Sequence, residues 1–143
     1  MGLLRAVLLA GLVAAAPATA EETISYQSLV TPLLAAGETV IGQPIVYPAG
    51  KAKVTAAVVT LPPGGETGWH VHAVPLFATI LDGALTVDYG AKGTKLYEAG
   101  DSLLEAVDWP HNGTNRGNVP VRILAVYIGA DGLANAEPAA TPR

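Results

Sequence analysis

From residue 51 onward, apolar and polar residues alternate in short runs that end at glycine or proline. The run 54–61 is rich in β-branched residues and ends at Pro62-Pro63-Gly64-Gly65; later runs cover 76–81, 84–89, 95–98, 102–107 and 121–128. Such runs, bounded by turn residues, are typical of strands, and no helical period interrupts them. Many short strands at regular spacing predict an all-β sandwich or small barrel.

Two turns stand out between these predicted strands. Asp82-Gly83 separates the runs 76–81 and 84–89, and this pair favours a tight type I′ hairpin because both residues accept positive φ. Trp109-Pro110 interrupts strand pairing just before His111, since proline has no amide proton to donate to a neighbouring strand.

The two ends of the chain differ from this β-rich centre. Residues 1–20 combine Arg5, an apolar stretch over 6–16 and the small residues Ala18-Thr19-Ala20, a pattern that predicts a cleavable signal helix and a periplasmic or secreted mature chain. The apolar stretch is shorter than the roughly 20 residues of a membrane-spanning helix, so we expect no stable span after cleavage. We predict an N-terminal extension or edge strand over 21–50, the barrel over 51–129 and a flexible C-terminal tail over 130–143.

The composition of the chain limits the partners and the metal ligands that we expect. The chain has 143 residues, with 8 Lys and Arg against 12 Asp and Glu and a net charge of −4. It has no basic cluster that could follow a phosphate backbone, so nucleic acid is not an expected partner. The chain contains no cysteine. Any metal must therefore be held by nitrogen and oxygen atoms. The fold also has no disulfide to stabilise it.

The three histidines of the chain, His70, His72 and His111, fall in two glycine-anchored segments. In a strand, the His-x-His pair directs both rings to one face while Val71 points the other way. A third imidazole from the second segment would complete a metal site, and three imidazoles suit Fe(II), Zn, Cu or Ni better than Mg or Ca. Taken alone, the pair also fits two half-exposed strand histidines.

The spacing around these histidines resembles that of the cupin family. Gly64, His70, His72 and Gly83 follow the first cupin motif, and Gly100, His111 and Asn115 follow the second. The resemblance implies a double-stranded β-helix, a jelly-roll-like barrel, with the three histidines as metal ligands at its open mouth. The family's fourth ligand is a glutamate, and Leu76 holds that position here.

The absence of the motif glutamate changes the function that we expect. A regular strand directs Leu76 inward and a bulge at Pro75 would direct Phe77 inward instead, but either side chain is apolar. Three neutral ligands leave the double positive charge of the metal and an open position, where a small anionic organic ligand would bind. The resemblance to cupin dioxygenases with three histidines favours Fe(II) and an oxygen-dependent dioxygenase.

Two alternatives stay open. The histidines can be hydrogen-bonded groups of a barrel that lost its metal with the glutamate. The pocket can also belong to a non-catalytic periplasmic protein that binds a small molecule or a metal, and no catalytic residue is identified. Cupin barrels often pair through an edge strand, so by analogy residues 21–50 contribute to a homodimer.

Other side chains near the histidines have two interpretations each. Glu66 can fold back toward the metal or remain a solvated loop residue. Glu105 shares the strand parity of Leu103 and can point inward as a base or as a partner of the ligand histidines. Trp69 and Trp109 can line the pocket or pack at the barrel rim. For Asn115 we expect side-chain to backbone bonds that fix a turn.

Overall fold

The structure, a computed structural model, describes residues 24–142, in two units that divide after Thr31. In the first unit, the described residues contain the short 3-10 helix η1 (Tyr26–Leu29). The second unit begins at Pro32 and holds the β-structure. The predicted signal helix lies outside the described residues. Within the described part of the chain, none of the helices is long and apolar enough to cross a membrane.

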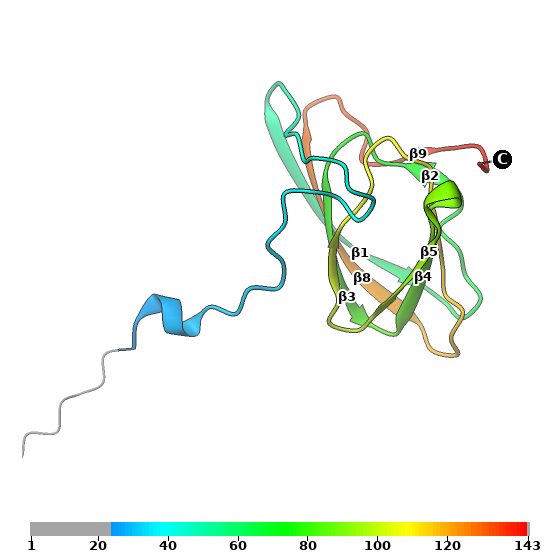
Figure 1. Cartoon of the computed structure of the whole chain (residues 1–143), viewed down its shortest axis with the longest axis horizontal. Helices are drawn as coiled ribbons and strands as arrows, with labels where there is room; N and C mark the ends of the chain where they lie inside the picture. The colour runs from blue at the N-terminus through cyan, green and yellow to red at the C-terminus, as the bar shows by residue number, and fades with distance from the viewer. Residues whose placement is uncertain (1–23, 143) are drawn as a thin grey trace, which may run out of the picture. The chain divides into compact units, whose positions relative to one another are not determined.

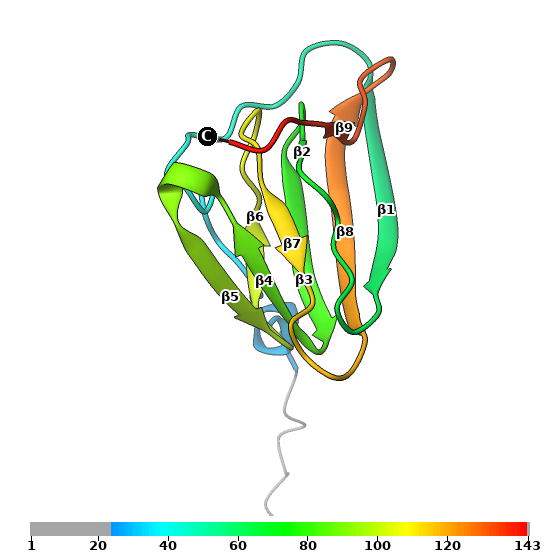
Figure 2. The same ribbon diagram turned by 90° about the vertical axis from the view of Figure 1, so that its right-hand side faces the viewer.

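Within residues 24–142, the strands form three sheets (Figures 1 and 2). The largest has the order β1 (Ala52–Leu61), β8 (Val121–Ala130), β3 (Leu76–Asp82), β6 (Ser102–Leu104). The second has the order β5 (Thr94–Glu98), β4 (Ala84–Asp88), β7 (Asn112–Thr114), and the 3-10 helix η2 (Gly90–Lys92) links β4 to β5. The third pairs β2 (His70–Val71) with β9 (Glu137–Pro138). The predicted all-β fold is confirmed.

The longest ladder joins β1 to β8 in antiparallel register over ten residue pairs, from Ala52↔Ala130 to Leu61↔Val121. Side chains alternate along β8, so that Val121, Ile123 and Ala125 are buried between exposed or partly exposed neighbours. The two larger sheets enclose one apolar core, which contains Leu61, Ala78, Ile80, Leu85, Val87, Tyr89, Tyr97, Leu103, Ala106, Val121 and Ile123.

The hairpin predicted at Asp82-Gly83 is wrong, although the turn itself is present. β3 and β4 belong to different sheets and do not pair. Gly83 alone adopts positive φ, at 76°, whereas a type I′ turn requires positive φ at Asp82 as well. A Cβ on Gly83 would lie 2.8 Å from the Pro120 carbonyl oxygen. The glycine therefore allows the chain to turn sharply from one sheet to the other, where the Pro120 backbone leaves no room for a side chain.

Residues 32–50 run beside the second half of the barrel. The Val40 amide donates to the Leu104 carbonyl at 2.9 Å. The Gln43 side chain donates to the Val107 carbonyl at 2.8 Å and accepts from the Val107 amide at 3.0 Å. These bonds hold the start of the second unit against the segment that leads from β6 toward His111.

The segment after β8 crosses back to the histidines. β8 ends at Ala130, inside the stretch predicted as a flexible tail, and β9 follows within the same stretch. β9 pairs with β2 through His70↔Pro138 and Val71↔Glu137, and the Ala139 amide donates to the Trp69 carbonyl at 2.9 Å. We call residues 135–139 the C-terminal strap.

Candidate metal centre

Backbone pairing brings the three histidines together from distant parts of the chain. His70 and His111 form an isolated antiparallel bridge, in which each amide donates to the other carbonyl at 3.0 Å. His72 forms a parallel bridge with Val107, and its carbonyl accepts from the Asp108 amide at 2.8 Å. Because the first and second motif segments pair directly at the histidines, the backbone sets where each ring starts.

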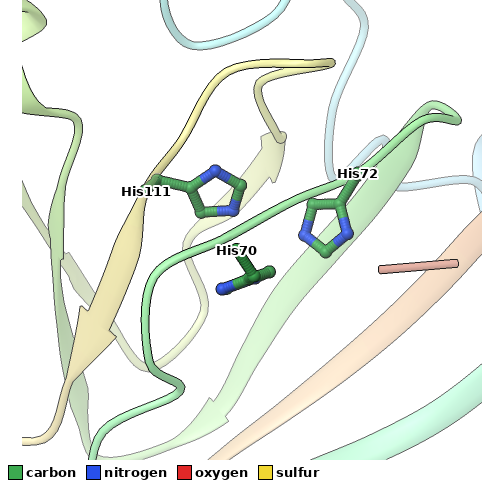
Figure 3. Close-up of side chains that lie close together, drawn as sticks. All are labelled: His70, His72 and His111. Carbon is green, nitrogen blue, oxygen red and sulfur yellow. The ribbon is translucent and has the colours of Figure 1, made fainter. Parts of the chain in front are cut away.

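The three imidazole rings lie close together, tilted relative to one another (Figure 3). Their centroids lie 4.8 Å apart for His70 and His72, 4.4 Å for His70 and His111, and 5.0 Å for His72 and His111. One ligand nitrogen from each ring lies within 4.8 Å of the other two. Two metal–nitrogen bonds of about 2.1 Å span at most about 4.2 Å, so a small inward rotation of the rings places all three nitrogens on one ion.

Backbone carbonyls select the tautomer of all three rings. Each Nδ1 lies 2.8 Å from a carbonyl oxygen, which belongs to Gly68 for His70, Asn135 for His72 and Trp109 for His111. A carbonyl oxygen can only accept a hydrogen bond, so each Nδ1 donates and carries the proton. Each Nε2 then keeps its lone pair, which is the form that binds a metal.

Burial keeps these rings neutral. Desolvation lowers the pKa of His72 from 6.5 to about 4, against the opposing effect of its bond to Asn135. Desolvation is also the largest cause that lowers the pKa of His70 and of His111. At neutral pH the Nε2 atom of each of the three rings is therefore unprotonated. The residues present fit a first-row transition metal, which binds neutral imidazole readily.

The rings line a cavity of about 540 Å³ inside the barrel. Most of its wall is apolar, from residues that include Val59, Leu61, Leu76, Ile80, Val87, Leu103, Ile123 and Ala125. Trp69 and residues 136–138 of the C-terminal strap also line it. The Tyr127 ring lies 5.6 Å from that of His72. The cavity therefore suits an organic molecule with an apolar body and a polar group directed at the histidines.

A buried carboxyl group lies beside the triad. Glu105 is 6% exposed, and its Oε2 is 3.9 Å from Nε2 of His111. The Tyr89 hydroxyl donates to Oε2 at 3.2 Å, and the Ala106 amide donates to Oε1 at 2.7 Å. Burial raises the pKa of Glu105 and the pKa of Tyr89 above their ordinary values. It also raises the pKa of Tyr97, whose hydroxyl lies 3.2 Å from that of Tyr89, to about 12.

The other candidates divide between the cavity and its surroundings. Leu76 is buried and lines the cavity, so the inward position of the strand belongs to it rather than to Phe77. Glu66 is exposed and accepts from the Asn112 side chain at 3.1 Å, away from the triad. Trp69 lines the cavity, whereas Trp109 packs against the core.

Two more side chains, those of Trp109 and Asn115, fix the surroundings of the site through hydrogen bonds to the backbone. The Trp109 Nε1 donates to the Tyr89 carbonyl at 2.9 Å. Asn115 is fully buried, donates to the carbonyls of Leu61 and Val119, and accepts from the Gly117 amide at 3.0 Å. These are the side-chain to backbone bonds expected for Asn115.

Three features of the site were not anticipated from the sequence. The Tyr89 and Tyr97 hydroxyls contact each other, and the Tyr89 hydroxyl also donates to Glu105. The Asn135 carbonyl contacts His72 from a segment predicted as a tail. Only the inward parity of Glu105 gave a signal, because the identity of a residue does not indicate which backbone carbonyl it will contact.

Fold and site define a class of protein: a small β-barrel with three histidines in an apolar cavity. The family model for the cupin domain matches residues 57–127. The chain belongs to the cupin superfamily.

Solved structures share this fold. An oxalate decarboxylase of Lactobacillus farciminis, in a formate complex, is 23% identical over 59% of this chain and 26% of its own, with a TM-score of 0.52. A chain from a study of DMSP lyases is 20% identical over 61% of this chain and 44% of its own, with a TM-score of 0.53. This chain thus spans a quarter to less than half of their length. A search of curated proteins finds no match.

Proposed function

We propose that the protein binds one divalent first-row transition metal through His70, His72 and His111. The observation that carries this proposal is the set of three Nδ1 to carbonyl bonds, each 2.8 Å long. All three rings therefore have the same tautomer, with Nε2 available to a shared ion. Fe(II) is our first choice of metal, and Zn, Cu and Ni are compatible with the same donors.

We further propose that a small organic anion binds in the cavity. The imidazoles are neutral, so they leave positive charge on the ion to attract an anion. The apolar wall excludes water and would pack against the body of the ligand. A carboxylate, enolate or phenolate on a compact hydrocarbon frame has both properties.

The reaction class that we propose is oxygen-dependent oxidation of this bound ligand. The metal would supply the redox chemistry. The chain's own contribution is to hold the three nitrogens, to shield the ligand from water with Leu76, Ile123 and their apolar neighbours, and to close one side of the cavity with the C-terminal strap.

A non-catalytic protein that binds a small molecule or metal is the second candidate. One observation favours it: both oxygens of Glu105, the buried carboxylate in the described cavity, already accept hydrogen bonds. Oxygen consumption separates the two candidates. The Fe(II)-loaded protein should consume O₂ with a catechol, diketone or thiol from a substrate panel, whereas tight binding without consumption would favour the binding protein.

Metal content tests the site itself. Protein purified without chelators should carry close to one equivalent of a first-row metal by elemental analysis, and His111→Ala should lose most of it. We expect the affinity of His111→Ala for added Co²⁺ to fall by at least about 100-fold, because a ligand is lost outright. Wild-type protein that stays metal-free in metal-containing medium would reject the proposal.

We also propose that the mature chain is exported after cleavage behind Ala20, into the periplasm or the medium, and that it forms a homodimer. N-terminal sequencing of protein from the native host would show whether Glu21 is the first residue. Sedimentation of the mature chain, with and without residues 21–40, would test the dimer; a monomer in both cases would reject it.

A further inference from the structure

Glu105 is the one acidic residue that is buried within residues 24–142. Burying a carboxylate without a positive partner is costly. The hydrogen bonds from Tyr89 and Ala106 offset part of this cost, and they hold the carboxylate at the wall of the histidine cavity. The group facing it there is Nε2 of His111, which is neutral in the tautomer that the structure selects. The missing positive charge is what a bound cation would supply.

The register of the sheet places Glu105 next to the position of the missing motif glutamate. β3 pairs with β6 through Phe77↔Leu104, and just beyond this pair the Glu105 amide donates to the Leu76 carbonyl at 2.8 Å. Leu76 and Glu105 both line the cavity. The carboxylate that Leu76 lacks is therefore present on the adjacent strand segment, facing the same space.

The distance from Glu105 to one ring of the triad, that of His111, permits a shared ion. Oε2 of Glu105 lies 3.9 Å from Nε2 of His111, within the roughly 4.2 Å that two metal–ligand bonds of about 2.1 Å can span. A carboxylate oxygen has two lone pairs, and the Tyr89 hydroxyl occupies one on Oε2. The other remains for a cation between Glu105 and His111.

We propose that Glu105 is the fourth protein ligand of the metal, supplied by the strand segment beside the one that usually carries it. This inference rests on the proposed metal site. It deepens that proposal by making the donor set three imidazoles and one carboxylate. The charge left on a divalent ion is then one rather than two, which favours binding of a singly charged organic anion.

The test uses Co²⁺ as the probe with the full mature chain and three variants. Glu105→Gln keeps the size and one of the two acceptor oxygens but removes the charge. Glu66→Gln is the matched control at an exposed carboxylate. Leu76→Glu combined with Glu105→Gln moves the carboxylate to the motif position. Thermal unfolding of each metal-free variant checks that it folds.

We expect Glu105→Gln to weaken Co²⁺ binding by about ten- to a hundredfold, since even outer partners of metal ligands contribute that much. Its visible absorption bands of bound Co²⁺ should also change, because the donor set changes. Glu66→Gln should match the wild type in both respects. The double variant should regain most of the affinity, which a purely structural role of Glu105 would not produce.

Wild-type affinity and an unchanged Co²⁺ spectrum in Glu105→Gln would overturn the inference and leave the triad intact. If the wild-type protein does not bind Co²⁺ either, the proposed metal site itself is rejected. Should Glu105→Gln fail to fold, Glu105→Asp keeps the charge and withdraws it by one methylene. An unchanged Co²⁺ spectrum in that variant would then overturn the inference.

Discussion

The barrel contains a regular region and an irregular one, and the contrast explains where the site lies. In the regular region, β8 pairs with β1 over ten consecutive residues and with β3 on its other side, so the ladders use carbonyls of β8 in both directions. In the irregular region, β2 and β9 pair over two residues and His70 meets His111 in a single bridge. The three carbonyls that bond the imidazoles belong to Gly68, Trp109 and Asn135, which all lie outside the strands. Broken pairing thus leaves free the carbonyl acceptors that orient the three imidazoles.

The largest effect that we predict from this contrast is acid sensitivity confined to the histidine region. The pKa of His72 is about 4 in the folded metal-free protein and near 6.5 when unfolded. Between these values the unfolded state binds more protons, so stability falls as pH decreases from 6.5 toward 4. For His72 alone the loss is about 3 kcal/mol, and His70 and His111 shift in the same direction.

Urea unfolding of the metal-free chain at pH 7 and at pH 4.5 measures this loss. His72→Gln should lose clearly less stability on acidification than the wild type, because it removes the group whose pKa changes most. Equal losses of stability in the two proteins would show that the acid sensitivity does not come from His72. The two regions would then not differ in their response to pH.

The two regions also differ in how well the sequence predicts them. The strands of the regular region follow from β-branched alternation, and the predicted run 121–128 lies within β8. Period two also places His70 and His72 on one side, and the inward parity of Glu105 with Leu103 appears in their shared burial. These features depend on local geometry alone, which is why residue patterns suffice for them.

What the sequence could not provide is pairing between distant segments. The turn at Asp82-Gly83 looks the same locally whether it closes a hairpin or crosses between sheets, and only the sheet order distinguishes the two. The contact between the Asn135 carbonyl and His72 spans 63 positions and involves a backbone atom. No residue type marks it.

The next effect separates stability from metal binding in the regular region. Val121 is fully buried in the core opposite Leu61, and it does not line the histidine cavity. Val121→Ala removes two methyl groups and leaves a void, so we expect a loss of about 2 kcal/mol in the free energy of unfolding. The loss should be similar at pH 7 and pH 4.5, and Co²⁺ affinity should stay within about twofold. A large drop in affinity would show that the core and the site are coupled.

The smallest effect concerns the C-terminal strap, the one orienting segment that can be removed whole. A chain ending at Leu133 loses the Asn135 carbonyl from His72 and β9 from β2. Water would then replace the carbonyl, both tautomers of His72 would become accessible, and Co²⁺ affinity should fall by about tenfold. A chain ending at Ala139 keeps the strap and serves as the control, with affinity equal to that of the full chain. Equal Co²⁺ affinity in both truncated chains would show that the C-terminal strap is not needed to orient His72. Irregular strand pairing would then matter to the site only through the carbonyls of Gly68 and Trp109.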